Sequence, residues 1–116
     1  DGLLAALRLA EALARSDSSL AEVAHSLPGV LQVKLEVPCS WEKRAAVMQV
    51  LNDPHRPRLQ GFGDGLVFGG SSANARTVLL PLSDKPSIIV LSEAEDEAAA
   101  QRNAAEWEAI LLATQT

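Results

Sequence analysis

The stretch from Val30 to Val37 alternates apolar and polar side chains and is closed by Pro38. One side of an extended segment would carry Leu31, Val33, Leu35 and Val37, and the other side Gln32, Lys34 and Glu36. This period of two is typical of a strand with one face on a core and the other in water. The chain must therefore supply a second layer that covers one side of a sheet.

The residues after this strand predict one helix and two hairpins. Ser40 is placed to cap a helix from Trp41 to Leu51, and the two prolines of NDPHRPR predict a loop. Gly63-Asp64-Gly65 predicts a turn between short strands. The four expected strands are Arg58–Phe62, Leu66–Phe68, Thr77–Leu82 and Ser87–Ser92.

A last helix is expected at the C-terminal end. Glu95, Asp96 and Glu97 would form its first turn, where the helix dipole favours acidic side chains. Its buried stripe would be Ala100, Ala104, Trp107, Ile110 and Leu111.

Two further helices precede the alternating strand. Leu3–Ala14 is rich in Leu and Ala, and its apolar residues surround most of the helix, so it should be buried from several directions. Ser19 and Glu22 form a capping box for a second short helix that runs to about Leu27. Pro28-Gly29 ends it.

The predicted order is therefore ααβαββββα, an α+β fold. Residues 29–116 would form one domain, an antiparallel sheet of four or five strands with two helices on one face. Residues 1–28 would be a helical appendage to it.

Composition excludes some functions. The 116 residues are 47% hydrophobic, enough to bury a core, and the net charge of −5 argues against a nucleic-acid partner. Cys39 is the single cysteine, so an intrachain disulfide is impossible. No apolar run approaches the ~20 residues that span a bilayer, and the first residues do not read as a signal peptide, so we expect a cytoplasmic protein without a membrane partner.

No residue pattern here predicts catalysis or a metal site. His25 and His55 lack a second ligand at metal spacing, and Cys39 has no nearby histidine, so we interpret it as a half-buried apolar residue. Trp41 and Trp107 are expected in core or interdomain packing. The acidic cluster Glu93, Glu95, Asp96 and Glu97 is explained by the helix start, and GFGDG is not followed by a helix, as a dinucleotide fingerprint would be.

Three stretches carry a family resemblance that covers nearly the whole chain. DGLLAALRLAEALARSDSSLAEVAHSLP resembles the segment that closes the third domain of α-D-phosphohexomutases. LEVPCSWEKRAAVMQVL is similar to the V-P-C-P-W-E-x-K-x-x-V-M-R-x-L stretch that opens their fourth domain, most of all in the mutase-like unit fused to mannose-1-phosphate guanylyltransferase-type enzymes. DGLVF and TVLLPLSDKPSIIVLSEAEDEAAAQ resemble the closing part of that domain.

This resemblance implies the C-terminal part of a phosphomannomutase or phosphoglucomutase type of protein, with a fold like that of the TATA-box-binding protein. Such isomerases of carbohydrate metabolism move a phosphoryl group between O1 and O6 of a hexose, using a phosphoserine and Mg²⁺. Both the serine loop and the metal loop belong to earlier domains. The resemblance therefore implies Mg²⁺ for the parent protein and neither a cofactor nor a catalytic residue for this chain.

The fourth domain of this family grips the substrate phosphate with a loop that reads R-P-S-G-T-E-P. The matching segment here runs from Leu80 to Pro86 and keeps only the two prolines. Ser83 stands at the glycine position and Asp84 at the threonine position, while Lys85 is the one cation. An aspartate where a phosphate dianion should sit predicts a degenerate loop.

Three functions remain open from the sequence. The domain contributes a lid to a hexose-phosphate site in a parent mutase, or it serves assembly or regulation of a fused sugar-nucleotide transferase, or it is an unrelated small interaction module. The expected partners are the preceding domains of the parent and its hexose phosphate. The exposed apolar sides of Leu3–Ala14 also offer a surface on which a second copy can pair.

Overall fold

The computed structural model describes residues 1–27, 29, 31–53, 57–70, 72 and 74–116, with Phe62 described by its backbone alone. Its elements, in chain order, are α1 (Gly2–Arg15), α2 (Leu20–Ser26), β1 (Leu31–Pro38), α3 (Trp41–Leu51), β2 (Leu59–Phe62), β3 (Leu66–Gly69), β4 (Arg76–Pro81), β5 (Ser87–Ala94) and α4 (Glu97–Thr114). The predicted order of helices and strands is confirmed.

One antiparallel sheet contains all five strands, in the spatial order β1-β5-β4-β3-β2. Strands β2 to β5 each pair with the next strand in the chain, whereas β1 pairs with β5, which lies far from it in the sequence. That pairing runs over the full length of β1, from Leu31 opposite Ala94 to Pro38 opposite Ser87. The α+β class and the antiparallel sheet predicted from the sequence are therefore confirmed.

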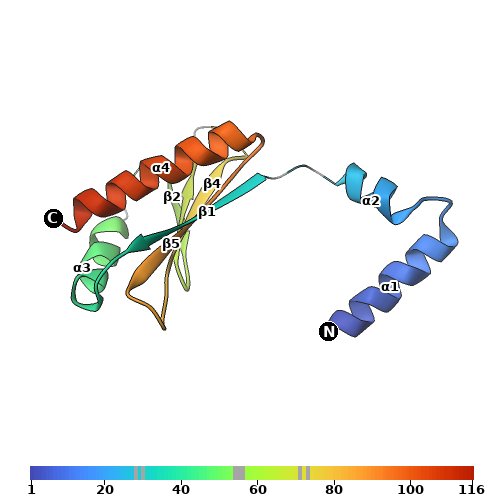
Figure 1. Ribbon diagram of the computed structural model, residues 1–116, viewed down its shortest axis with the longest axis horizontal. Coiled ribbons are helices and arrows are strands. Elements are labelled where there is room, and N and C mark those ends of the chain that lie inside the picture. The colour runs from blue at the N-terminus through green and yellow to red at the C-terminus, as the bar shows by residue number, and fades with distance from the viewer. Residues whose placement is uncertain (28, 30, 54–56, 71, 73) are drawn as a thin grey trace.

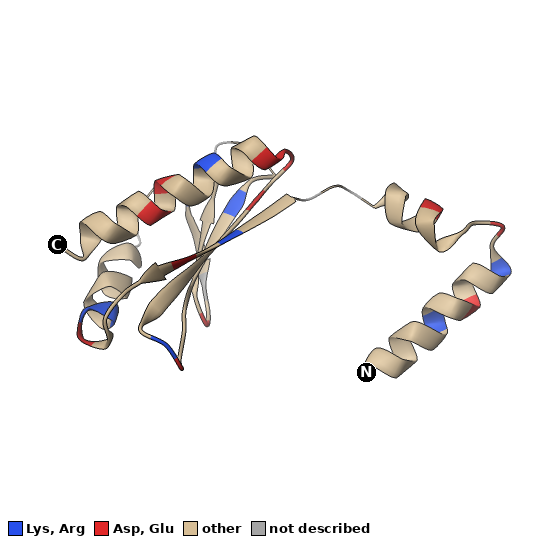
Figure 2. Ribbon diagram, viewed as in Figure 1, with Lys and Arg blue, Asp and Glu red and all other residues tan. Residues whose placement is uncertain are grey.

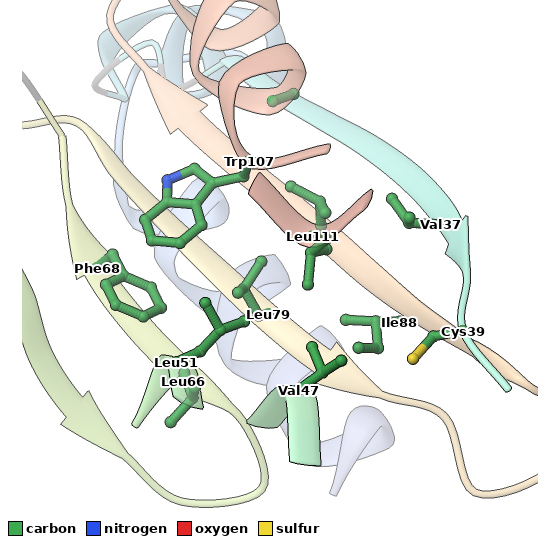
Figure 3. Packing of buried hydrophobic residues seen from close by; sticks show 12 residues of the cluster. Val37, Cys39, Val47, Leu51, Leu66, Phe68, Leu79, Ile88, Trp107 and Leu111 are labelled. Atoms are coloured by element: carbon green, nitrogen blue, oxygen red, sulfur yellow. The ribbon is translucent and has the colours of Figure 1, made fainter. Parts of the chain in front are cut away.

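The core lies between one face of the sheet and the two helices α3 and α4, which lie on the same side of it (Figure 1). In β1, Val33, Leu35 and Val37 turn towards this core, while the polar residues between them are exposed, as the alternation predicts. Leu31, which was expected on the same side, is 45% exposed and lies outside the core cluster. Figure 3 shows side chains from both helices meeting those of the sheet. The main cluster of buried residues is Val37, Cys39, Val47, Leu51, Leu66, Phe68, Leu79, Ile88, Val90, Ala104, Trp107 and Leu111.

The β2–β3 hairpin turns at Gly63-Asp64-Gly65, as predicted, and is closed by a hydrogen bond of 3.0 Å from Gly63 N–H to the Gly65 carbonyl. A Cβ atom on Gly65 would lie 2.3 Å from the Leu79 carbonyl oxygen, so only glycine fits there. Strand β2 begins at Leu59 and not at Arg58 as predicted, because Arg58 has a positive φ of 71° that an extended strand does not allow.

Other predicted boundaries shift by a few residues. Strand β4 ends at Pro81, before the predicted Leu82. Strand β5 continues to Ala94, because β1 pairs with it on one side and β4 on the other. Helix α4 begins at Glu97 with Asp96 as its cap, whose side chain accepts a hydrogen bond of 2.7 Å from Ala99 N–H. Ser40 occupies the cap position of α3 but makes no side-chain capping bond.

Helices α1 and α2 stand apart from the sheet (Figure 1), and neither contributes a buried residue. The predicted capping box of α2 is present, with both Ser19–Glu22 hydrogen bonds formed. The burial expected for α1 is not found in this chain, since Leu3, Leu4 and Leu7 are all largely exposed. Among the described residues, no helix combines the length and the apolar run that a membrane crossing requires.

Candidate functional site

Residues 82–86, which we call the tip, join β4 to β5 at the end of the sheet where β1 ends and α3 begins. The hydrogen bonds that close it run from Leu82 N–H to the Ser87 carbonyl at 3.1 Å and from Ser87 N–H to the Lys85 carbonyl at 2.8 Å. Ser83, Asp84 and Lys85, the three predicted site residues, are all exposed. The structure therefore brings them together on one solvated turn, where Figure 2 shows adjacent acidic and basic positions.

The segment from Cys39 to Arg44, which leads out of β1 into the first turn of α3, holds the tip in place. Cys39 N–H donates a hydrogen bond of 2.8 Å to the carbonyl oxygen of Pro86, at one end of the tip. At the other end the Arg44 guanidinium donates to the carbonyl oxygen of Leu82. The same guanidinium lies 4.3 Å from the ring centroid of Trp41, a favourable cation–π distance. Two contacts from a single segment thus fix both ends of the turn.

The charged partner of Lys85 comes from the neighbouring strand. Nζ of Lys85 lies 4.0 Å from Oε2 of Glu36 on β1, so its recorded ion pair is with Glu36 and not with Asp84. Ser87 Oγ donates a hydrogen bond of 2.7 Å to the other carboxylate oxygen of Glu36. A groove of about 390 Å³, the Lys85 groove, is lined by Glu36, Pro38, Lys85, Pro86 and Ser87.

This arrangement disfavours a phosphate dianion. The carboxylate of Glu36 lies 4.0 Å from the ammonium group of Lys85, and Asp84 is the residue next to Lys85 on the exposed turn. At surface-like screening a charge pair ~4 Å apart interacts by up to a few kcal/mol. A surface ion pair contributes about 1 kcal/mol or less, so Lys85 cannot offset both repulsions.

A second groove, of about 420 Å³, lies between α3 and the β2–β3 turn. Its lining residues are Met48, Gln49, Asn52, Gly63, Asp64, Gly65, Leu66 and Pro81. The polar side chains among them are exposed, and the lining mixes neutral, acidic and apolar groups. The lining therefore selects no single class of ligand.

Cys39 is more deeply buried than predicted, with 1% of its surface exposed. Burial raises the pKa of its thiol above the ordinary value, and the positive charges of Arg44 and Lys43 oppose this rise less strongly. The thiol is therefore protonated at neutral pH and has a packing role, since the thiolate is the reactive form.

The other residues considered from the sequence have structural surroundings. His25 lies on an exposed helix with Nδ1 2.7 Å from the Ala21 carbonyl oxygen, and His55 lies outside the described residues. Trp107 is buried in the core, as predicted. The prediction that Trp41 packs in the core is wrong, because 45% of its surface is exposed. Its packing against another domain stays a prediction.

The acidic cluster is divided among separate partners. Glu93 pairs with Arg76 and accepts a hydrogen bond of 3.0 Å from Gln32, and these bonds, that from Arg76 above all, hold the pKa of Glu93 below its ordinary value. Glu95 accepts from Asn74, outside the helix that was expected to contain it. Within the described part of the chain, no three His, Cys, Asp or Glu side chains are grouped to hold a metal ion.

Sequence reasoning missed Glu36, Arg44 and Ser87 as neighbours of the tip. The spacing of Trp41 and Arg44 on one helix is a local signal for their contact. The contact between Glu36 and Ser87 depends on the pairing of β1 with β5, which no local pattern reveals. Comparison of this chain with models of known protein families and with curated proteins found no match.

Proposed function

We propose that residues 29–116 are the C-terminal domain of a phosphohexomutase-family protein, with the TATA-box-binding-protein-like fold of that domain. Residues 1–28 are then the helical tail of the domain before it. The parent interconverts hexose 1-phosphates and 6-phosphates, and this chain alone is not catalytic. The family resemblance implies that Mg²⁺ is held by other domains of the parent.

The observation that supports this proposal is a contact between two of the three segments that carry the resemblance. The segment LEVPCSWEKRAAVMQVL and the tip meet through the bond from Cys39 N–H to the Pro86 carbonyl and the bond from Arg44 to the Leu82 carbonyl. These segments lie about forty residues apart in the chain. Their association gives the tip a defined position relative to β1 and α3, as a ligand loop on a rigid scaffold requires.

A second role is supported by the charge of the tip. Asp84 is next to Lys85 in the chain and Glu36 pairs with it, so the tip offers substrate phosphate no excess of positive charge. The alternative function is therefore a non-catalytic, mutase-like domain that serves assembly or regulation of a fused sugar-nucleotide transferase of the mannose-1-phosphate guanylyltransferase type. An intact phosphoserine motif and a D-G-D-x-D loop upstream in the parent would favour the catalytic role, and their loss the second.

The degenerate loop is tested by restoring the residues of the family. We expect titration of the unmodified chain with mannose 1-phosphate or glucose 6-phosphate to leave the amide NMR signals of residues 82–87 unchanged at millimolar ligand. The double variant Ser83→Gly/Asp84→Thr removes the repulsive charge and supplies a hydroxyl and flexible N–H donors. It should show saturable shifts at the same residues.

A matched control lies on the neighbouring hairpin. Asp64→Thr removes the same charge from the exposed β2–β3 turn and should produce no binding. Micromolar binding of hexose phosphate by the unmodified chain would refute the degenerate loop. If the double variant gains no binding, or if Asp64→Thr gains as much, the tip is not a decayed phosphate site and the family proposal loses its support.

A further inference from the structure

The carboxylate of Glu36 contacts two donor side chains at the C-terminal end of the tip, those of Lys85 and Ser87. Ser87 Oγ donates to Oε1 of Glu36 at 2.7 Å, and Nζ of Lys85 lies 4.0 Å from Oε2. Ser87 is only 4% exposed, so packing fixes the position of its hydroxyl group. Lys85 and Glu36 are about half exposed and can change partners at little cost.

The turn beside the Lys85 groove offers further donors for an anion. The backbone N–H groups of Ser83, Asp84 and Lys85 donate no recorded hydrogen bond within the described part of the chain. An ammonium group, a fixed hydroxyl and free N–H groups are the donors that bind a small oxyanion. In this structure the carboxylate of Glu36 takes the place of such an oxyanion at Lys85 and Ser87.

We propose that Glu36 is a built-in occupant of a latent oxyanion site formed by Lys85, Ser87 and the N–H groups of the tip. A phosphate-like oxyanion binds this site once the carboxylate of Glu36 is neutralised or drawn to another cation. The inference rests on the proposed function, because it explains how the tip is kept from binding phosphate.

The other charged groups around the site do not replace Glu36. Asp84 lies next to Lys85 on the exposed turn and adds repulsion, but no ion pair is recorded for it among the described residues. Arg44 donates to the Leu82 carbonyl and stacks on Trp41, so its guanidinium is already engaged at the far end of the tip.

The experiment is an amide NMR titration of the full 116-residue chain with inorganic phosphate, with ionic strength held constant by sodium chloride. The compared proteins are the unmodified chain, Glu36→Gln and Glu36→Ala. Glu36→Ala removes both the charge and the acceptor of the Ser87 bond, whereas Glu36→Gln removes the charge alone. We expect both variants to bind phosphate at Ser83–Ser87 at least about fivefold more tightly than the unmodified chain, as one charge ~4 Å away requires even in water.

Two controls isolate the site. Glu108→Gln changes the net charge equally on helix α4 and should leave phosphate binding unchanged. Lys85→Gln in the Glu36→Ala background should abolish the gain. A well-dispersed spectrum that matches the unmodified chain outside the tip shows that each variant is folded, and one folded Glu36 variant is enough for the comparison.

The outcomes separate this inference from the proposed function. If the Glu36 variants gain no phosphate binding, or if Lys85→Gln leaves the gain intact, the latent site is refuted, even where Ser83→Gly/Asp84→Thr binds hexose phosphate. If the Glu36 variants gain binding and the double variant does not, the latent site stands while the proposed function loses its support. An equal gain in phosphate binding by Glu108→Gln would show that the gain comes from net charge alone, and it would refute the site.

Discussion

The rings of Phe68 and Trp107 lie with their centroids 4.1 Å apart and their planes inclined by 34°. This contact joins strand β3 to helix α4 across the core (Figure 3). Aromatic pairs in contact contribute to stability beyond the area that they bury. Trp107 is therefore the largest of the side chains by which α4 packs on the sheet, together with Ala104 and Leu111.

Trp107→Ala should lower the free energy of unfolding by about 3–5 kcal/mol, because it leaves a large cavity against Phe68. Urea unfolding followed by far-UV circular dichroism measures this change. The matched control is Trp41→Ala, which truncates an exposed tryptophan and should cost less than about 1 kcal/mol. Equal losses in the two variants would show that Trp107 does not anchor α4.

The Arg76–Glu93 pair should give the chain a defined loss of stability in acid. The hydrogen bond from Arg76 lowers the pKa of Glu93 below its ordinary value of 4.5. A lowered pKa in the folded state means that the contribution is complete above pH 4.5 and is lost as the pH falls through the folded-state value. The advantage of the unmodified chain over Glu93→Gln should therefore be constant from neutral pH to about pH 5 and shrink below it.

Unfolding of both proteins between pH 7 and 3 checks this prediction. Because Arg76 is largely exposed, the advantage should be about 1 kcal/mol or less. Arg76→Gln removes the partner and should abolish the same pH dependence. An advantage that grows towards low pH would contradict the direction assigned to the pKa of Glu93.

Asn103 should be replaceable by leucine with a gain in stability. It lies in α4 with 8% of its surface exposed, and its Nδ2 is buried without a hydrogen-bond partner in the described part of the chain. Leucine removes the unpaired donor and favours the helix, so Asn103→Leu should raise the free energy of unfolding by about 1 kcal/mol. Asn103→Asp should lower it, because it buries a charge. Thermal unfolding of the unmodified chain and the two variants checks this prediction. A loss of stability in Asn103→Leu would mean that Nδ2 of Asn103 has a hydrogen-bond partner.

Helix α1 should make the isolated chain self-associate. Its leucines are exposed, and every buried residue described lies between Val37 and Leu111, so removal of residues 1–28 leaves the core complete. Sedimentation should show dimers of the full chain that disappear on truncation and in Leu7→Glu, which places a charge on the apolar side. A dimer unchanged by truncation would exclude pairing through α1. A dimer that is lost on truncation and in Leu7→Glu would show that the two copies pair through α1.

The order of the helices and strands could be predicted from the sequence, because each pattern that indicates an element depends only on residues close together in the chain. The alternation in β1, the turn at Gly63-Asp64-Gly65 and the capping box of Ser19 and Glu22 all act within a few residues. Boundaries moved where tertiary pairing decides them, as at Ala94, where β5 continues because β1 lies beside it. The exposure of α1 could not be read from its leucines, which indicate burial without naming the partner.

The candidate site could be predicted only in part, for the same reason. Ser83, Asp84 and Lys85 are adjacent in the chain, so a local motif places them on one turn. Glu36 lies about fifty residues before Ser87, and Arg44 approaches the turn from a helix. Long-range pairing thus determines the electrostatics around Lys85, while the local sequence determines only its exposure.

The position of β1 at the edge, paired along its whole length with β5, also sets the order of events during synthesis. On the ribosome, β1 emerges well before its partner strand β5 is synthesised, because Leu31 pairs with Ala94. Until then its apolar side chains have no sheet to join, and closing so long a loop makes folding slow. The sheet is therefore completed only after β5 has been synthesised, and a nascent chain stalled before β5 presents β1 to chaperones or to its neighbours.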